Sequence, residues 1–289
     1  MRIVSWNIQW GRGADGVVDL ARTIKVMRGF DADVLCLQEV SVDFAGLSGG
    51  PTGDQLAALS AAFAGYAAIY GPAVDLGGEP GGTSFGNLIL SRAPVLQVWR
   101  HLLPWPADGA VPSMQRGCVE AVVEHEGVPI RVLTTHLEYY SSLARLAQAQ
   151  RLAQLQAEVC EFELAPRSTK EAGPFSPRPR PSRAVLCGDF NCRADEAAHR
   201  AVQADVAAQP WRDAWRALGD VREHAPTVGL HGAEWPDSPY CCDFFFISAN
   251  LLPAVHSVDV ASATAASDHQ PVVLELALAG VPAGSIRAR

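Results

Sequence analysis

The feature that most constrains this chain is a short apolar run ending in a polar residue, a pattern that occurs repeatedly. The clearest case is Gly188-Asp189-Phe190-Asn191, which follows the apolar run 184–187 and precedes a polar helix start at 193–196. A buried strand that ends in glycine and a carboxylate directs that carboxylate out of the sheet edge, where catalytic groups are commonly held. Taken alone, Asp189 and Asn191 could equally well do no more than cap the next helix.

The same arrangement recurs elsewhere in the sequence. A polar side chain stands at one end of each apolar run: Asn7 after 3–6, Gln38 and Glu39 after 34–37, His136 after 130–135, Asp243 before 244–247, and Asp268 and His269 before 272–274. Because strand ends of neighbouring strands meet at one edge of a sheet, we expect these side chains to converge at one rim of a sheet pair.

The strand and helix patterns predict the fold class. The chain has 289 residues, of which 48% are hydrophobic, enough for a core of ordinary size. Strands dominate, and too few helices intervene for every strand pair to be a parallel crossover, so we expect an α+β protein of mixed sheets in layers. We expect one domain over residues 1–289, with a Pro/Arg-rich loop insertion at 165–183 that could contact an anionic substrate but more simply forms a solvated loop. The glycine-rich segment 71–86 predicts a long surface loop.

Charge and cysteine content limit the partners and the compartment. With 23 basic and 31 acidic residues the formal net charge is −8, which argues mildly against tight binding of polyanions. Neither a signal peptide nor a membrane span is expected, because no apolar run reaches about 18 residues. The seven cysteines form no CxxC pair, so we expect reduced thiols in a cytoplasmic protein. The adjacent Cys241 and Cys242 lack the second pair that a zinc or redox site would need.

The polar residues at the run ends are of the types that hold a hard metal ion. They comprise the carboxylates Glu39, Asp189, Asp243 and Asp268, the amides Asn7, Asn87 and Asn191, and the imidazoles His136 and His269. Oxygen-rich sites select Mg²⁺, for which Mn²⁺ can substitute, and the sequence offers no tetrahedral Cys/His set for Zn²⁺. Such a site suits phosphoryl transfer to water, with fixed donors stabilising the growing charge. The pair Asp243 and His269 suggests a carboxylate that orients an imidazole.

Seven motifs in one order carry a family resemblance. They are Ser5-Trp6-Asn7, Leu37-Gln38-Glu39, Gly86-Asn87-Leu88-Ile89-Leu90-Ser91-Arg92, Thr135-His136-Leu137, Gly188-Asp189-Phe190-Asn191, Asp243-Phe244-Phe245-Phe246-Ile247-Ser248 and Ser267-Asp268-His269-Gln270-Pro271-Val272. Together they resemble the motif set of the endonuclease/exonuclease/phosphatase superfamily. The resemblance implies a four-layer αββα sandwich of two mixed β-sheets flanked by helices, with the site at the rim between the sheets.

The resemblance also implies a role for each motif residue. Glu39 is similar to the family's metal-binding glutamate, with Asn7 beside it and Asp268 as a direct or water-bridged ligand. Asp189 resembles the residue that activates the nucleophilic water, and Asn191 its partner in holding the phosphate. His269 resembles the catalytic histidine oriented by Asp243, and His136 the donor to the phosphate or leaving oxygen. Asn87 and Arg116 stand where substrate contacts are expected, Arg116 against the alternative of a plain surface arginine.

The sequence departs from the abasic-site endonucleases of this superfamily, because Val40 and Ser41 follow Glu39 where a lysine is usual. It is nearer to the branch of pancreatic-type deoxyribonucleases, sphingomyelinases and tyrosyl-DNA phosphodiesterases. We therefore expect a monomeric Mg²⁺-dependent phosphodiesterase, with a phosphomonoesterase or a non-catalytic binding protein as alternatives. The substrate stays open among nucleic acid, a small diester and a lipid head group; Trp105, Trp211 and Trp235 could stack bases or simply pack.

Overall fold

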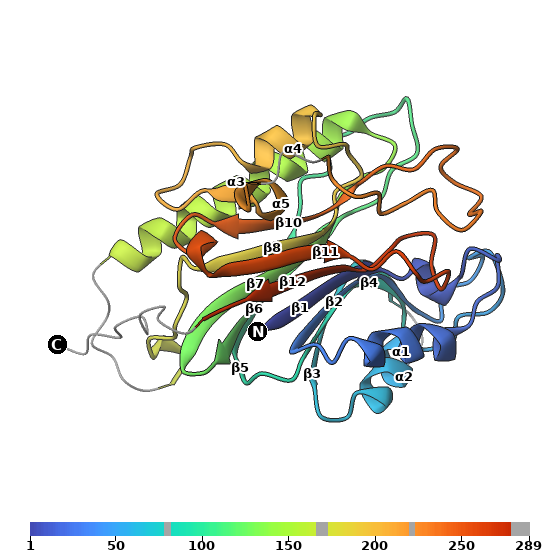
Figure 1. Ribbon diagram of the computed structural model, residues 1–289, viewed down its shortest axis with the longest axis horizontal. Helices are drawn as coiled ribbons and strands as arrows, with labels where there is room; N and C mark the ends of the chain where they lie inside the picture. The colour runs from blue at the N-terminus through green and yellow to red at the C-terminus, as the bar shows by residue number, and fades with distance from the viewer. Residues whose placement is uncertain (78–81, 166–172, 220–222, 279–289) are drawn as a thin grey trace.

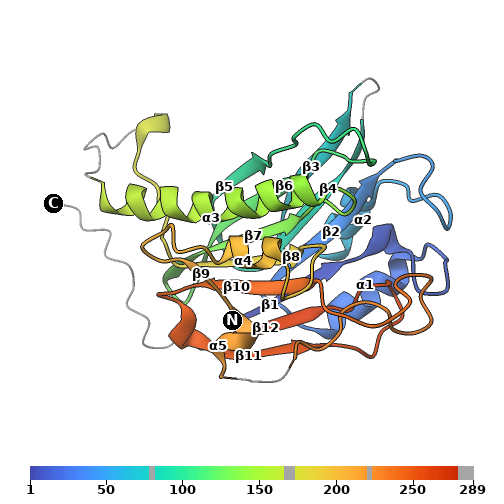
Figure 2. The ribbon, with the colours of Figure 1, turned by 90° about the horizontal axis from the view of Figure 1, so that it is seen from above.

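The computed structural model describes residues 1–77, 82–165, 173–219 and 223–278. Two β-sheets lie face to face, and helices cover the outer face of each, giving four layers (Figures 1 and 2). Within the described residues no helix is long and apolar enough to cross a membrane. The two mixed six-stranded sheets confirm the predicted α+β sandwich.

The described elements comprise twelve strands, five α-helices and three short 3₁₀ helices. The first sheet contains β1 (Arg2–Asn7), β2 (Val34–Val42), β3 (Ala67–Leu76), β4 (Thr83–Ser91), β11 (Val255–Val260) and β12 (Val272–Leu276). The second contains β5 (Val95–Leu102), β6 (Gly117–His125), β7 (Val128–His136), β8 (Ala184–Asp189), β9 (Trp211–Asp213) and β10 (Asp243–Ser248). The helices are α1 (Leu20–Gly29), α2 (Gln55–Ala62), α3 (Ser142–Leu164), α4 (Ala197–Val202), α5 (Ala214–Ala217), η1 (Gln9–Gly11), η2 (Gly173–Phe175) and η3 (Leu252–Ala254).

The strand orders bring the predicted motifs to neighbouring strands. The first sheet has the order β11-β12-β1-β2-β4-β3 and the second β5-β6-β7-β8-β10-β9. The pairs β1–β2 and β7–β8 are parallel, so the carboxyl ends of these four strands share a rim. The strand β10 runs antiparallel to β8 and places Asp243 opposite Asp189.

Alternation along the strands decides which side chains face the space between the sheets. In β1, Ile3 belongs to the core between the sheets, whereas Val4 and Trp6 pack in the layer that also holds Met27 of α1. Successive side chains point to opposite faces of a strand, so Asn7 shares the inner face with Ile3. The same alternation puts His136 on the inner face of β7, Asp189 on that of β8 and Asp243 on that of β10. The rim of the inner core is therefore polar.

The prediction of a long surface loop at 71–86 is wrong for 71–76 and 83–86, and residues 78–81 lie outside the described residues. The strand β3 continues to Leu76 and pairs with β4 from Thr83, with a bulge between Pro72 and Val74. The glycines reflect close backbone packing: a Cβ on Gly86 would lie 2.3 Å from the carbonyl oxygen of Gly71. Composition alone did not separate this requirement from that of a turn.

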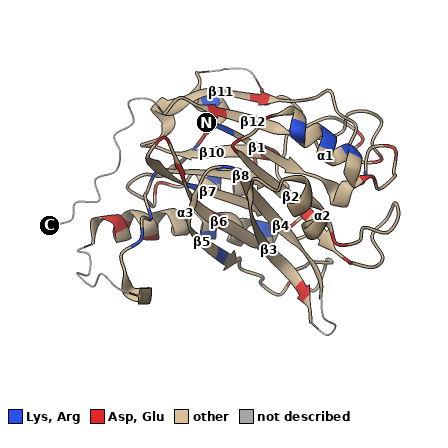
Figure 3. Ribbon diagram, turned by 90° about the horizontal axis from the view of Figure 1, so that it is seen from below, with Lys and Arg blue, Asp and Glu red and all other residues tan. Residues whose placement is uncertain are grey.

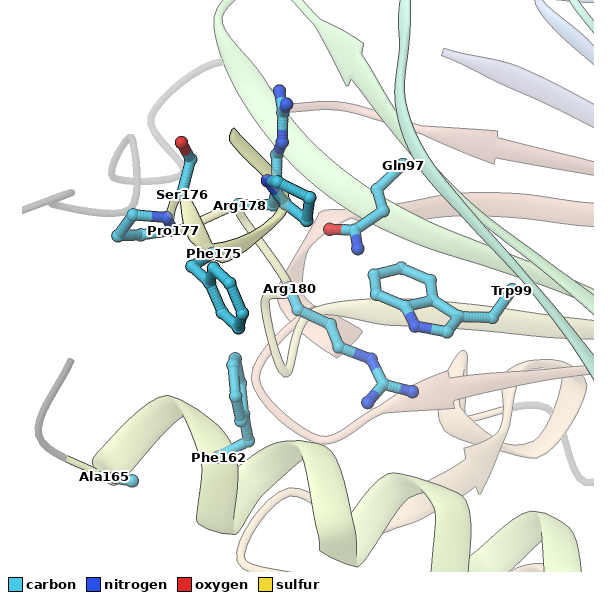
Figure 4. Close-up of a pocket in the computed structure, with 10 residues that line it drawn as sticks. Gln97, Trp99, Phe162, Ala165, Phe175, Ser176, Pro177, Arg178 and Arg180 are labelled. Carbon is cyan, nitrogen blue, oxygen red and sulfur yellow. The ribbon is translucent and has the colours of Figure 1, made fainter. Parts of the chain in front are cut away.

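The predicted insertion at 165–183 lies partly outside the described residues, because 166–172 are not described. Its later part packs on the outer face of the second sheet. The guanidinium of Arg180 lies 4.4 Å from the Trp99 ring centroid, and Phe162 and Phe175 face each other across a cavity of about 400 Å³ (Figure 4). The insertion leads into the start of β8, whereas Asp189 ends that strand, so this cavity lies away from the polar rim.

Candidate active site

The site begins with Asn7, whose amide joins the two sheets. Its Nδ2 donates to Glu39 Oε1 at 3.1 Å and to Asp189 Oδ2 at 3.0 Å. Glu39 belongs to the first sheet and Asp189 to the second. Asn7 is 1% exposed, so both hydrogen bonds are shielded from water and fix the two carboxylates relative to each other.

Glu39 reaches the rim because of a break in β2. The register with β4 shifts between Leu37 and Val40, and Glu39 adopts the left-handed backbone conformation with φ 61°. A non-glycine residue in that conformation is uncommon and is found at sites where the chain must redirect a side chain. In contrast, Gln38 stays on the inner face and donates to Thr134 Oγ1 of β7 at 2.8 Å. The bulge therefore aims Glu39 at the rim while Gln38 holds the sheets together.

The Glu39 carboxylate is poised to bind a cation. Burial, together with the neighbouring Asp268 carboxylate, raises the pKa of Glu39 to about 7. Its Oε2 is buried and has no hydrogen-bond partner among the described residues. Burial also raises the pKa of Asp268, whose Oδ2 accepts from Gln9 Nε2 at 2.7 Å. Two crowded carboxylates with an unsatisfied oxygen are the arrangement that a hard divalent ion would relieve.

Asp189 lies between two imidazoles. Its Oδ2 is 3.4 Å from His136 Nε2 and 3.6 Å from His269 Nε2, while its Oδ1 accepts from the backbone N–H of Asn191 at 2.9 Å. Asn191 adopts the left-handed conformation with φ 49°, which turns the chain back so that this contact forms. The carboxylate is thus fixed in a narrow space with an imidazole on either side.

His136 is held as a neutral imidazole. Burial, reinforced by the Arg116 guanidinium, lowers its pKa to about 3. Asn191 Nδ2 lies 3.0 Å from His136 Nε2 and also donates to the Leu137 carbonyl at 2.9 Å. With Nε2 accepting that bond, the ring proton sits on Nδ1, which is 3.8 Å from Glu39 Oε1.

The pKa of His269, in contrast to that of His136, is raised. Its Nδ1 pairs with Asp243 Oδ2 at 2.9 Å. Although burial opposes the charge, the carboxylates of Asp243, Asp189 and Asp268 raise the pKa of His269 well above its ordinary range. Asp243 therefore fixes the ring with a proton on Nδ1 and leaves Nε2 facing Asp189.

The two predicted substrate contacts lie on the β4 side of the rim. Asn87 and Arg116 line a small cavity together with Glu39 and His136. Arg116 is 6% exposed, and its Nε lies 3.4 Å from Glu138 Oε2, so it is no plain surface arginine. Asn87 Nδ2 donates to the Gly117 carbonyl at 3.1 Å. The structure thus brings every predicted site residue to one rim.

Several residues at this rim were missed from the sequence. Gln9 holds Asp268, and Ser267 Oγ lies 3.2 Å from Asp268 Oδ1. The buried Glu138 pairs with Arg116 and accepts from the Tyr139 and Tyr140 backbones; no apolar run marks it. Ligand atoms of Cys242, Asp189 and His269 lie within 4.8 Å of one another. Burial raises the pKa of the Cys242 thiol well above its ordinary range, and a thiol is a soft ligand that a hard ion such as Mg²⁺ does not favour.

A second cluster, formed by His199, Asp213 and His224, also groups possible metal ligands. Both imidazole Nε2 atoms contact Asp213 Oδ2, at 3.0 and 2.7 Å. Gln203 accepts from the Asp213 backbone N–H through Oε1 and turns its Nε2 to His199 Nδ1 at 3.2 Å. His199 Nδ1 is then an acceptor and Nε2 carries the proton, whereas a metal at Nε2 requires the reverse. Hydrogen bonding accounts for this cluster.

Two stacked sheets with carboxylates, amides and imidazoles gathered between their rims define a hydrolase of phosphoester bonds. The chain belongs to the Endonuclease/Exonuclease/phosphatase family, whose model matches residues 4–269. This membership confirms the resemblance found in the motifs. No curated protein gives a match in sequence comparison.

Solved structures share the fold. An endonuclease/exonuclease/phosphatase from Beutenbergia cavernae DSM 12333 is 26% identical with a TM-score of 0.63, covering 96% of this chain and 71% of that one. One from Bacteroides vulgatus is 19% identical with a TM-score of 0.66, covering 96% and 98%. D. rerio TDP2, complexed with single strand DNA product, is 18% identical with a TM-score of 0.59, covering 95% and 97%.

Proposed function

We propose that this protein is a Mg²⁺-dependent phosphodiesterase that hydrolyses its substrate by attack of water, with Mn²⁺ as a substitute ion. The observation that carries the proposal is the buried Oε2 of Glu39, which has no hydrogen-bond partner in the described part of the chain and whose carboxyl pKa is raised to about 7 by burial beside Asp268. These oxygen donors fit Mg²⁺, which uses one or two carboxylates and keeps several waters. When bound, the ion would polarise a non-bridging phosphate oxygen and offset its charge.

Glu39 and Asp268 are the residues that would hold the ion, directly or through water. Asn7 has a supporting geometry, because its Nδ2 donates to the carboxylates of Glu39 and Asp189 and its Oδ1 accepts from the Gln9 backbone at 3.0 Å. The amide thus steadies Glu39, and a metal-ligand role for Asn7 Oδ1 stays a prediction.

The remaining site residues act on the attacking water, the phosphate and the leaving oxygen. Asp189 Oδ2, within 3.6 Å of both imidazoles, orients the attacking water and accepts its proton. Asn191 fixes Asp189 and His136. Protonated His269, oriented by Asp243, donates to the phosphate, and the Nδ1–H of neutral His136 donates to the phosphate or the leaving oxygen. Asn87 and Arg116 bind the substrate on the β4 side.

The charge balance favours a diester over a monoester. The rim gathers the carboxylates of Glu39, Asp189, Asp243 and Asp268, and the Arg116 guanidinium is already paired with a fifth carboxylate, that of Glu138. A dianionic monoester would bring a second negative charge into this environment, whereas a diester brings one. A phosphomonoesterase is the second candidate that the experiment must separate.

The proposed unit is residues 1–289, acting as a cytoplasmic monomer. All seven cysteines are described, and none is in a disulfide. The site draws on both sheets of a single chain, so it requires no partner copy. Nucleic acid is among the proposed substrates, since a structure with the same fold, D. rerio TDP2, is complexed with single strand DNA product.

The test compares bis-(p-nitrophenyl) phosphate with p-nitrophenyl phosphate, in Mg²⁺ and in chelator. We expect Mg²⁺-dependent cleavage of the diester and a loss of about 10²- to 10⁴-fold in the Asp189→Asn variant. Asp195→Asn, a carboxylate on the polar turn before α4, is the matched control and keeps full activity. Equal hydrolysis by wild type and Asp189→Asn would refute the role of Asp189, and exclusive cleavage of the monoester would refute the diesterase.

A further inference from the structure

Four aromatic side chains form a continuous row that leads away from His269. The Trp235 ring centroid lies 6.5 Å from that of His269, with an interplanar angle of 34°. Tyr139 lies 5.5 Å from Trp235, and Tyr140 lies 4.7 Å from Tyr139. Tyr240 lies 5.8 Å from Trp235 on another side. We call Tyr139, Tyr140, Trp235 and Tyr240 the aromatic row; no step of the proposed reaction uses it.

The two tyrosines are held on a fixed turn after β7. The buried Glu138 accepts through Oε1 from the backbone N–H groups of Tyr139 and Tyr140, at 2.9 and 3.1 Å. Arg145 Nη1 donates to the carbonyl oxygens of Glu138 and Tyr139, at 2.8 and 2.7 Å. These charge-assisted bonds keep the turn in one conformation while the rings point outward.

The segment that carries Trp235 is tied to the catalytic rim. It leads into β10, whose first residue Asp243 pairs with His269, and it lies at the same end of the sandwich as the rim (Figure 1). Val228 forms antiparallel bridges with both Tyr240 and His269. These bridges hold the two ends of the loop that carries Trp235 beside His269.

The rings are placed to receive flat groups. Tyr139 is 39% exposed and Tyr140 59%, and their mutual interplanar angle is 84°. An edge-to-face pair covers a face of one ring only, so the exposed Tyr139 and Tyr140 keep open ring faces, whereas Trp235 and Tyr240 are partly exposed. Open aromatic faces in series are what single-stranded nucleic acid uses for base stacking. A duplex keeps its bases stacked inside and offers none.

We propose that the aromatic row is a subsite for the unpaired bases of a single-stranded nucleic acid whose phosphodiester lies at His269. This inference rests on the proposed diesterase and names its substrate class. It also reconciles the net charge of −8 with a nucleic-acid substrate. In the view of Figure 3, basic positions gather on α1, and elsewhere basic and acidic positions are interspersed over the described elements.

Charges beside the row favour this occupant over a lipid surface. The Arg193 guanidinium lies 4.1 Å from the Tyr240 ring centroid, where it can meet a phosphate next to a stacked base. Glu234 stands directly before Trp235 with its side chain 77% exposed, and its Oε2 pairs with Arg12 Nη2 at 3.0 Å. Insertion of Trp235 into a membrane interface would carry that carboxylate with it, which is costly.

The test measures binding in the Asp189→Asn background with Mg²⁺, by fluorescence anisotropy of labelled oligonucleotides. The probes are a thymidine 12-mer, a 12-mer of abasic tetrahydrofuran residues with the same phosphates, and a 12-base-pair duplex. We expect the thymidine strand to bind about 10- to 100-fold more tightly than the abasic strand and the duplex. Trp235→Leu and Tyr140→Leu should each remove most of that preference. Tyr140 is well exposed, so its variant folds even if Trp235→Leu does not.

Phe162→Leu is the matched control, since this ring is 52% exposed at the far end of α3. It should leave binding unchanged. Equal binding of the thymidine and abasic strands, or equal losses in Phe162→Leu and Tyr140→Leu, would overturn the inference. If bis-(p-nitrophenyl) phosphate is cleaved while binding ignores the bases, the subsite fails and the diesterase stands. Base-dependent binding without any hydrolysis by wild type supports the subsite and contradicts the diesterase.

Discussion

Replacing Glu39 by glutamine should stabilise the metal-free protein while abolishing its response to Mg²⁺. The side chain is 16% exposed, and burial beside Asp268 raises its carboxyl pKa from 4.5 to about 7. Glutamine keeps an oxygen for the Asn7 Nδ2 hydrogen bond and removes the charge. A rise of this size corresponds to about 3 kcal/mol, at 1.36 kcal/mol for each tenfold change in proton affinity.

The pH dependence follows from the sign of this pKa change. The unfolded chain loses the Glu39 proton near pH 4.5 and the folded chain near pH 7, so the folded state binds the extra proton between them. The contribution of Glu39 to stability is therefore present below about pH 4.5 and is lost as the pH rises through 7. The difference between variant and wild type should be near zero at pH 4.5 and about 3 kcal/mol at pH 8.

Urea unfolding in chelator, at pH 5 and pH 8, measures this difference directly. Taking the variant minus the wild type cancels the groups that titrate alike in both. Mg²⁺ should then raise the stability of the wild type and leave Glu39→Gln almost unchanged, because binding to the folded state alone is stabilising. A variant that is less stable than wild type at pH 8 in chelator would refute the reasoning.

Three further substitutions test other parts of the account. Glu120→Gln should lower the free energy of unfolding in urea by about 3–5 kcal/mol at pH 7, because it leaves Arg131 buried without its partner. Burial by itself would raise the pKa of Glu120, but the neighbouring cations lower it. The loss of stability should therefore shrink as the pH falls below 4.5. Gly188→Ala should lower the melting temperature, with a loss of at least about 2 kcal/mol, since φ is 142° and a Cβ would lie 1.9 Å from a carbonyl oxygen of β7; an unchanged melting temperature would contradict this. Asp243→Asn should lower the pKa of His269, measured by NMR of the ring, and slow diester cleavage at neutral pH at least about 100-fold; an unmoved pKa would show that Asp243 does not hold the ring charge.

The strand and helix pattern predicted an α+β protein of mixed sheets, and the family resemblance of the motifs predicted the four layers. Most of the candidate site residues were predicted from their places at the ends of apolar runs, because a strand end is a local property of the sequence. Asn7, Asp189 and Asp243 each end or begin an apolar run, so their position at a rim could be read from the sequence. Glu39 was also expected at the rim, but the way it gets there could not be predicted, since it depends on a bulge in β2 and on a left-handed backbone at that residue. The sequence also left open how the rims of the two sheets are placed relative to each other. The hydrogen bonds from Asn7 to Glu39 and Asp189 show that the two rims lie side by side.

Other features depend on contacts between distant segments and carry no local signal. Glu138 is buried by the turn that it caps, although a glutamate after a strand usually suggests exposure. Trp211, considered as a base-stacking residue, is fully buried in β9, and its Nε1 donates to the Leu152 carbonyl at 3.1 Å. Trp235 instead lies at the catalytic rim. Both tryptophans follow a polar or proline-containing stretch, and only tertiary packing distinguishes them.

The position of the bound cation tests the central claim most directly. Crystals grown with Mn²⁺ and measured at the manganese absorption edge would locate the ion from its anomalous signal. The account predicts a peak within about 2.5 Å of Glu39 Oε2, close to Asp268. A peak coordinated by His199, Asp213 and His224, or one at Asp189 and Cys242 without Glu39, would contradict it.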